Sequence, residues 1–214
     1  MRRTLVHLLR HGEVHNPAGV LYGRIPGYHL SGRGEQMAER IAEVLTQRSA
    51  DVAHVVASPL LRAQQTALPV AGAYDLPIHT DVRVIEARNH FEGLALSSNP
   101  RQLLNPVHWP FLINPFRPSW GEPYTSQVRR MFAAIRDARR AAQGREAVIT
   151  AHQLPIWLTR LELEGRPKFH DPRQRECALA SLTTLTFHGA TLVDLTYTEP
   201  AADLIDENTM SVGA

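Results

Sequence analysis

Three short apolar segments of this chain each run into polar residues at the carboxyl end. The segments are Leu5–Leu9, His54–Ala57 and Glu146–Ala151. Short apolar runs bounded in this way are typical of buried strands, and longer amphipathic segments separate them. Strands that alternate with helices predict an α/β fold with a mostly parallel sheet. In such folds ligands bind beyond the carboxyl ends of the strands, so the polar residues there are the first candidates for a site.

The helices between these strands are indicated by caps and by apolar spacing. Ser31 is a favourable N-cap for a helix that runs to about Gln47. The buried face of that helix would consist of Met37, Ile41, Val44 and Leu45. Ser58-Pro59 is expected to open a second helix towards Tyr74, with serine as the cap and proline in the first helical position. The other predicted elements are a strand near Pro77–His79, helices over 123–142 and 154–164, and paired strands over Leu182–Phe187 and Thr191–Tyr197.

The stretch from Asn99 to Pro123 differs from the rest of the chain. It holds six prolines, which exclude a long regular helix, and four large aromatic residues, which argue against simple disorder. The aromatic residues are Trp109, Phe111, Phe116 and Trp120. We expect a three-layer α/β/α sandwich formed by one domain over residues 1–200, with a Pro/aromatic lid inserted at 97–123. The acidic residues 201–214 are expected to form a loose tail.

The composition is that of a globular protein with a balanced charge. The 214 residues include 23 Lys and Arg against 21 Asp and Glu, a formal net charge of +2, without a dense basic stripe. We therefore expect no nucleic acid partner. The first apolar run is too short for a signal peptide or a membrane span, so we expect no membrane partner and a cytoplasmic location. Cys177 is the only cysteine, which excludes an internal disulfide. The oligomeric state stays open, with a homodimer as one alternative.

Cationic and imidazole side chains stand at all three predicted strand ends. Arg10 and His11 follow the first strand, and Arg62 lies in the helix after the second. His152 and Gln153 follow the third strand. Arginine binds a dianion through two parallel hydrogen bonds, and histidine can attack or move protons near neutral pH. These residue types at one edge of a sheet indicate a phosphoryl-binding site.

Five short motifs follow one another along the chain. They are Leu8-Leu9-Arg10-His11-Gly12-Glu13, Ser58-Pro59-Leu60-Leu61-Arg62-Ala63-Gln64-Gln65-Thr66-Ala67, Glu86 with Phe91-Glu92-Gly93, Gly121-Glu122, and Thr150-Ala151-His152. In this order they resemble the signature of the histidine phosphatase superfamily, the phosphoglycerate mutase-like proteins. The resemblance spans Leu5 to about Tyr197. It implies an enzyme that acts on a small phosphorylated substrate without a cofactor or a metal.

The resemblance also implies roles for individual residues. His11 would attack phosphorus through a ring nitrogen and become a phosphohistidine. Arg10 and Arg62 would clamp the phosphoryl oxygens, since phosphoryl transfer needs little beyond positioning and charge stabilisation. His152 would donate a further hydrogen bond to the phosphoryl group. Neighbouring cations would lower the pKa of His11 and so favour its neutral, nucleophilic form.

Glu86 would be the general acid for the leaving alkoxide and then the base for water. The segment from Glu86 to Gly93 is one residue shorter than the usual family spacing, so Glu92 or His90 could share this role.

Further candidates lie beside the motifs. Asn16 and Gly23 resemble phosphate-loop contacts, through an amide side chain and a backbone N–H. Arg24 could face either substrate or solvent. Gln153 begins a strand-to-helix turn whose amides could face an anion.

A phosphatase is favoured over a phosphoglycerate mutase-type enzyme. The substrate-contacting stretch that glycolytic mutases have before the second histidine is not recognisable, and the Pro/aromatic lid takes its place. A metal-dependent hydrolase is disfavoured, because the four-residue spacing of His7, His11 and His15 would align ligands only on a helix, and this segment is a predicted strand and turn. A non-catalytic phosphate-binding module is a third alternative, although every catalytic residue type is present.

Overall fold

The computed structural model describes residues 3–95, 99–112, 121–171 and 174–205 of the chain. The strands are β1 (Arg3–Arg10), β2 (Val52–Ala57), β3 (Ile78–Thr80), β4 (Glu146–Ala151), β5 (Leu182–His188) and β6 (Thr191–Thr198). The α-helices are α1 (Gly32–Gln47), α2 (Leu61–Ala73), α3 (Trp109–Leu112), α4 (Tyr124–Ala141) and α5 (Gln153–Leu163). Short 3₁₀ helices are η1 (Val82–Val84), η2 (Pro100–Leu104), η3 (Pro106–His108) and η5 (Ala202–Leu204).

In the described part of the chain, six strands form one sheet in the order β3-β2-β4-β1-β5-β6. Neighbours from β3 to β1 are parallel, whereas β1–β5 and β5–β6 are antiparallel. The α/β fold with a largely parallel sheet and a C-terminal hairpin is therefore confirmed. The register places Arg10 beside Ala151, and Ala57 beside Thr150. Strands β1, β2 and β4 consequently end at one edge of the sheet, which brings their following residues together.

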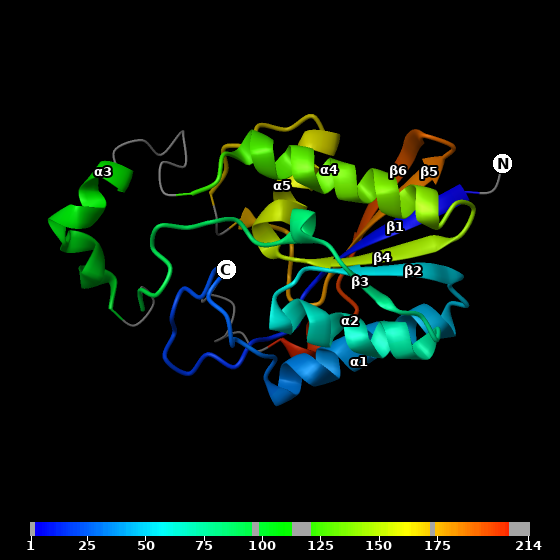
Figure 1. Ribbon diagram of the computed structural model, residues 1–214, viewed down its shortest axis with the longest axis horizontal. Coiled ribbons are helices and arrows are strands. Elements are labelled where there is room, and N and C mark those ends of the chain that lie inside the picture. Colours follow the sequence, from blue (N-terminus) through cyan, green and yellow to red (C-terminus); the bar gives the residue numbers. More distant parts are fainter. Residues whose placement is uncertain (1–2, 96–98, 113–120, 172–173, 206–214) are drawn as a thin grey trace.

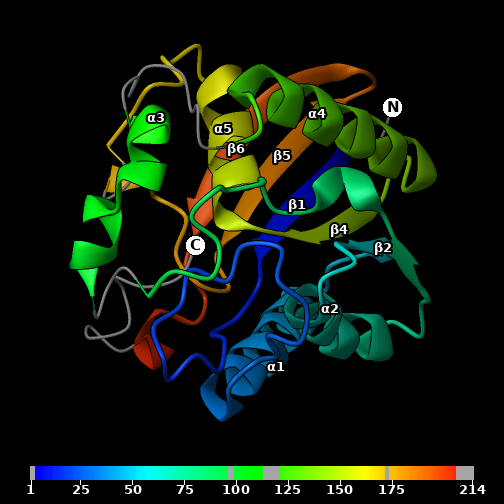
Figure 2. The same ribbon diagram turned by 60° about the vertical axis from the view of Figure 1, so that its left-hand side comes forward.

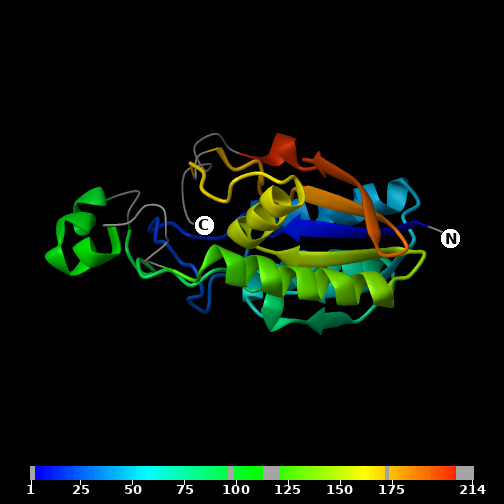
Figure 3. The same ribbon diagram turned by 90° about the horizontal axis from the view of Figure 1, so that it is seen from above.

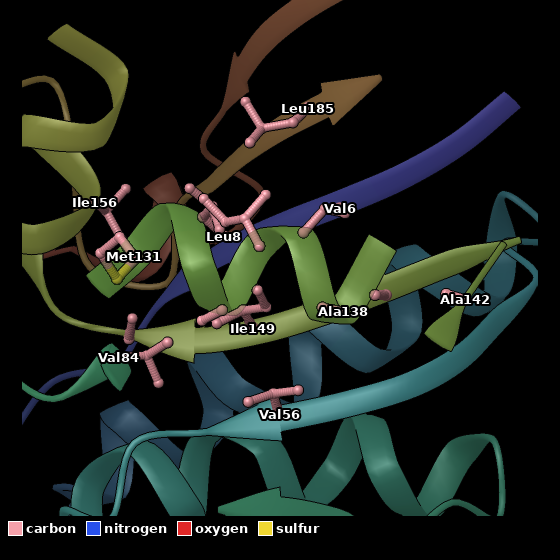
Figure 4. Close-up of a cluster of buried hydrophobic side chains, with 14 of the residues drawn as sticks. Val6, Leu8, Val56, Val84, Met131, Ala138, Ala142, Ile149, Ile156 and Leu185 are labelled. Carbon is pink, nitrogen blue, oxygen red and sulfur yellow. The ribbon is translucent and has the colours of Figure 1, made fainter. Parts of the chain in front are cut away.

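The sheet lies between two helical layers, as predicted for a three-layer sandwich. Helices α1 and α2 cover one face, and α4 and α5 cover the other (Figures 1 and 2). Side chains of β1 alternate between the two cores: Val6 and Leu8 pack with Met131 of α4, and Leu9 packs with Met37 of α1. Figure 4 shows Val6, Leu8 and Ile149 in the first of these cores, together with Ile156 from α5.

The prediction that Ser58-Pro59 opens the second helix is wrong. Helix α2 begins at Leu61, and its N-cap residue is Leu60, which makes no side-chain capping bond. The Ser58 side chain is buried and its Oγ lies 2.7 Å from His152 Nε2, so it is occupied by the neighbouring strand end instead. Arg62 is therefore the second residue of α2, in its first turn, rather than one turn further along.

The predicted lid is described in part. Residues 100–112 form the three short turns η2, η3 and α3, so no long helix crosses the prolines in this described part of the lid. This segment extends beyond the carboxyl ends of the parallel strands, away from the sandwich (Figures 1 and 3). The side chains of Leu104, Val107 and Trp109 are exposed there. Phe116 and Trp120, which the lid prediction also included, lie outside the described residues.

The sequence suggested a loose tail from residue 201, but residues 201–205 pack on the domain. Ala201 is buried, Asp203 forms an ion pair with Arg40 at 3.0 Å, and Leu204 packs against the core beside α1. Apolar contacts thus hold η5 on the sandwich, and the predicted tail beyond residue 205 lies outside the described residues. Within the described ranges, no helix is long and apolar enough to cross a membrane.

Candidate active site

His11 and His152 lie side by side at the carboxyl edge of the sheet. The backbone N–H of His11 donates to the Ala151 carbonyl at 3.1 Å, so the segment after β1 continues along the end of β4. The two imidazole centroids are 5.1 Å apart, and both side chains are fully buried. The parallel register of β1 and β4 therefore brings together two histidines that are 141 residues apart in the sequence.

The loop after β1 is held against the helices of one layer. Gly12 donates its N–H to Thr66 Oγ1 of α2 at 3.0 Å. A Cβ atom at Gly12 would lie 2.6 Å from the Gly34 carbonyl oxygen, which leaves no room for a side chain. Ser31 caps α1 and donates to Glu13 Oε1 at 2.6 Å. Glycines thus allow the close approach that fixes the position of the neighbouring His11.

Two hydrogen bonds define the tautomer of His11. Nδ1 lies 2.8 Å from the Gly12 carbonyl, which can only accept, so Nδ1 bears the proton. Arg62 donates its Nε–H to Nε2 at 3.3 Å, so Nε2 presents a lone pair. Burial, followed by the charges of Arg62 and Arg10, lowers the pKa of His11 well below its ordinary value. His11 is thus neutral at neutral pH, with Nε2 available as a nucleophile.

Arg62 and Arg10 place two cations beside this nitrogen. The Nη2 of Arg62 donates to the Gly23 carbonyl at 2.7 Å, and its guanidinium stacks 4.6 Å above the ring of Tyr22. Arg10 donates from Nη1 to the Cys177 carbonyl at 2.6 Å. Within the described residues, the buried Nε of Arg10 has no hydrogen-bond partner. A buried donor without an acceptor, beside a second cation, is favourable for an anion.

His152 is bound on both ring nitrogens. Nδ1 lies 3.4 Å from Arg62 Nη2, which can only donate, so Nδ1 is the acceptor and Nε2–H donates to Ser58 Oγ. Burial and the charge of Arg62 lower its pKa well below the usual value. The role expected for His152, a donor to the phosphoryl group, requires a proton on Nδ1. The Ser58 hydroxyl can supply that state without net charge, since it can turn and donate to Nε2.

Glu86 is the carboxyl group among these cations. It is buried, and its Oε1 accepts the Ala87 N–H at 2.7 Å. Burial raises its pKa and outweighs the hydrogen bond from Ala87 and the opposing charges of Arg62, Arg175 and Arg10. The protonated carboxyl is therefore favoured at a higher pH than in an exposed glutamate, as a general acid requires.

The other two candidates for proton transfer are differently placed. His90 is exposed and stacks on Phe111 of α3, with 3.6 Å between ring centroids. The negative charge of Glu92 acts to raise the pKa of Arg62. However, Glu92 Oε1 accepts the Asn89 N–H at 3.1 Å, and its side chain packs against Gly23. Gly23 has φ +38, and a Cβ there would overlap the Glu92 carboxylate.

The remaining predicted contacts are partly occupied by the protein itself. The Asn16 amide donates to the Val20 carbonyl at 2.8 Å and accepts the Val20 N–H at 3.1 Å, so it closes its own loop. Arg24 donates to the Glu86 carbonyl at 2.6 Å and forms an ion pair with Glu122 at 3.0 Å. Arg24 thus binds the backbone carbonyl of Glu86. The sequence had predicted that it faces either substrate or solvent.

A cavity of about 830 Å³ lies beside Arg24. Its wall includes Arg24, Ile85, His90, Phe111, Glu122 and Arg130, and His11 is not part of it. The cavity therefore lies between the residues on either side of Glu86, Phe111 of the lid and the start of α4, and neither His11 nor His152 lines it.

The three N-terminal histidines do not meet. His7 bonds to Thr184 and Glu146 inside the sheet, whereas His15 stacks on His29 in the following loop. Of the three, only His11 contacts Arg62, whereas His7 lies 3.0 Å from Arg48.

Two residues that belong to this site were missed in the sequence. Tyr22 covers Arg62, and Arg175 follows α5 and donates to Gln153 Oε1 at 3.2 Å. Gln153 in turn lies 3.4 Å from the Cys177 carbonyl that Arg10 also binds. Neither residue belongs to a recognised motif, and a single arginine in a polar loop gives no local signal of burial.

The fold and the site are those of a phosphoryl-handling enzyme. The family model of the histidine phosphatase superfamily, branch 1, matches residues 6–198, so the chain belongs to that superfamily. The Mycobacterium tuberculosis (strain ATCC 25618 / H37Rv) protein Rv0525 is 50% identical over 199 residues, which cover 93% of this chain and 98% of that protein. A Yersinia enterocolitica protein named Probable phosphoglycerate mutase GpmB is 29% identical over 184 residues, 82% of each chain.

Among solved structures, mycobacterial glucosyl-3-phosphoglycerate phosphatase Rv2419c superposes with a TM-score of 0.70 at 23% identity. The match covers 87% of this chain and 92% of that one, and it shows that the two share a fold.

Proposed function

We propose that this protein is a phosphomonoester hydrolase that works through a phosphohistidine at His11. The observation that supports this most directly is the neutral imidazole, whose Nε2 lone pair faces Arg62 inside a buried cationic pocket. A neutral ring nitrogen can attack phosphorus without a separate base, and the arginines stabilise the charge that develops on the phosphoryl oxygens.

The proposed reaction has two steps. Nε2 of His11 forms a bond to phosphorus as the ester P–O bond breaks, and the leaving alkoxide takes the proton of Glu86. Water then attacks the phosphohistidine, its proton goes to the Glu86 carboxylate, and the P–N bond breaks to release phosphate. The buried position of Glu86 supports both roles, because its raised pKa makes it a proton donor that can be reloaded. Arg10 and Arg62 would hold the phosphoryl oxygens throughout.

We propose a small phosphorylated molecule in the cytoplasm as the substrate. The mutase alternative rests on the 29% identity to the protein named Probable phosphoglycerate mutase GpmB. A mutase returns the phosphoryl group to a bound product, whereas a phosphatase gives it to water. Release of inorganic phosphate from a panel of phosphoesters separates the two, and isomerisation of phosphoglycerate without phosphate release would favour the mutase.

The decisive experiment combines turnover with trapping of the intermediate. The wild-type protein should hydrolyse p-nitrophenyl phosphate and, after an acid-free quench, hold phosphate that is stable to base and labile to acid. His11→Ala should lower turnover by about three orders of magnitude or more and abolish the trapped phosphate. His15→Ala is the matched control, since His15 stacks on His29 outside the site. Full activity in His11→Ala would refute the proposed nucleophile, and activity lost after exhaustive EDTA treatment would favour the metal-dependent alternative.

A further inference from the structure

Arg175 is a second cation on the α5 side of the site. It lies in the segment between α5 and β5, and its side chain is only partly exposed. Its Nε donates to His170 Nε2 at 2.9 Å, and its Nη1 donates to Gln153 Oε1 at 3.2 Å. Burial lowers its pKa, against the opposing charge of Glu86. Arg175 therefore faces the interior near the proposed acid, and it is not a solvated surface residue.

Arg175 has no ion-pair partner within the described residues. Both of its hydrogen-bond acceptors are neutral groups, and the charge of Glu86 acts on it without a direct contact in this part of the chain. Two other arginines of the domain do have carboxylate partners: Arg160 pairs with Glu164 at 2.7 Å, and Arg130 pairs with Glu122 at 2.9 Å. Burying a guanidinium without a counter-ion costs free energy unless a bound anion compensates its charge.

The orientation of this guanidinium is fixed by its neighbours. His170 Nδ1 lies 2.7 Å from the Lys168 carbonyl, so Nδ1 bears the proton and Nε2 accepts from Arg175. The His170 ring is held between Tyr124, 6.2 Å away in a stacked arrangement, and Trp157, 5.9 Å away edge-on. A side chain held in this way loses little freedom when it binds a ligand.

Hydrogen bonds link Arg175 to the phosphoryl pocket. Gln153 accepts from Arg175 and donates to the Cys177 carbonyl, which also accepts from Arg10 at 2.6 Å. Three hydrogen bonds, by way of Gln153 and the Cys177 carbonyl, thus join Arg175 to Arg10. A substrate whose phosphoryl group lies between Arg10 and His11 would direct its alcohol portion towards Glu86, the group whose charge acts on Arg175.

We propose that Arg175 is a specificity-determining residue that binds a second anionic group, a carboxylate or a phosphate, on the alcohol portion of the substrate. The inference rests on the proposed function and narrows its substrates to phosphomonoesters with two separate negative groups. The guanidinium donates Nε–H to His170 and one Nη1–H to Gln153, so its two Nη2–H groups and the second Nη1–H are left to bind either group.

The alternative explanation is that Arg175 affects the reaction only through the pKa of Glu86. Its charge lowers the pKa of that carboxyl, so its removal would shift the pH profile for every substrate alike. Under the present proposal, the loss is instead confined to substrates with a second anion and is found mainly in KM.

The test compares substrates that differ only in that second group. The pairs are 3-phosphoglycerate with glycerol 3-phosphate, and propane-1,3-diol bisphosphate with propyl phosphate. Arg175→Gln should lower kcat/KM about 10–100-fold for the doubly anionic member that binds. The other members and p-nitrophenyl phosphate, each assayed at the pH optimum of the variant, should change much less, so the ratio of kcat/KM within each pair measures the effect. Arg175→Lys should recover only part of the loss, because it keeps the charge but not the two-pronged geometry. The control is Arg166→Gln, since Arg166 is exposed and pairs with Glu164 at 2.8 Å.

The outcomes separate this inference from the proposed function. Equal losses for every substrate, with a displaced pH profile, would assign Arg175 to Glu86 and overturn the proposal, as would unchanged kinetics. If the wild-type protein hydrolyses no ester at all, the proposed function fails first. Calorimetric binding of the same four compounds to His11→Ala, with and without Arg175→Gln, then still tests the inference. A preference for the doubly anionic members that Arg175→Gln abolishes would support it.

Discussion

Hydrogen bonding and burial, rather than a neighbouring carboxylate, keep His11 neutral with a lone pair on Nε2. The Gly12 carbonyl keeps the proton on Nδ1, and Arg62 points its Nε–H at the nitrogen that would react. An arginine that only donates cannot remove a proton, so the free form of the imidazole has to be the neutral one already. Burial supplies this condition by lowering the pKa of the ring.

Glu86→Gln should separate esters by their leaving groups. Alkyl phosphates need a proton on the departing oxygen, so their rates should fall by about 10²–10⁴. The rate with p-nitrophenyl phosphate should fall by less than about tenfold, since nitrophenolate leaves without protonation. Steady-state kinetics on both ester types measures the difference.

Glu92→Gln is the matched control for this change, because Glu92 caps the Asn89 N–H in the same loop. Equal losses on both types of ester in Glu86→Gln would argue against Glu86 as the acid.

At this scale, the sequence predicted most of the site because its residues follow strand ends. Arg10 is the last residue of β1, His11 follows β1, and His152 follows β4. The topology of the sheet alone brings these three residues together. Arg175 could not be predicted, since its burial depends on His170 and Gln153 in separate segments. The roles of Asn16 and Arg24 inside the protein likewise depend on loop conformations that no periodicity encodes.

The first turn of α1 determines how closely the loop after β1 can approach. A Cβ at Gly34 would overlap the Glu13 backbone, whereas a Cβ at Gly32, two residues earlier, would meet nothing within 4 Å. Gly34→Ala should therefore displace the loop, lower the free energy of unfolding by about 1–3 kcal/mol and reduce turnover. Urea denaturation and phosphate release measure the two effects.

Gly32→Ala should leave turnover unchanged and stabilise the protein by about 0.5–1 kcal/mol, since alanine is the better helix former. If both variants behaved alike, close packing of the loop on α1 would not be what positions His11.

Among the elements, β4 matches its predicted bounds and α1 begins directly after its predicted cap, Ser31. The start of α2 was misplaced because Ser58 has the composition of a cap but is used by His152, a contact between residues 94 positions apart. Local preference is overruled here by a tertiary hydrogen bond. The lid could be recognised as irregular from its prolines, but not placed, since its direction depends on contacts such as that between His90 and Phe111.

For the whole molecule, buried histidines should make stability depend on pH. Burial lowers the pKa of His7, His11 and His152 in the folded state, so below about pH 6.5 the unfolded chain binds more protons and folding loses stability. Burial also lowers the pKa of His54 and His170, so Glu86, whose raised pKa acts in the opposite direction, is one group against five. The free energy of unfolding should fall from about pH 7 to about pH 5, by at most about 1.4 kcal/mol per pH unit for each histidine.

Urea denaturation at several pH values measures this slope. The double variant His11→Asn/His152→Gln keeps one N–H donor at each position and should flatten the slope in part, because it removes two of the five histidines whose pKa burial lowers. An unchanged slope would place the pH dependence elsewhere in the molecule.

The order in which the strands are synthesised gives β1 an unusual history. Among the described strands it is synthesised first, yet both of its neighbours in the sheet, β4 and β5, begin only at Glu146 and Leu182. A nascent chain that already contains His11, Arg62 and Glu86 still has no strand to pair with β1. Because such long-range pairing is slow, we expect the apolar Leu5–Leu9 run to stay unpaired until β4 has been synthesised. The site is therefore assembled only after β4, and a product truncated before Glu146 would expose an aggregation-prone strand instead of retaining part of the site.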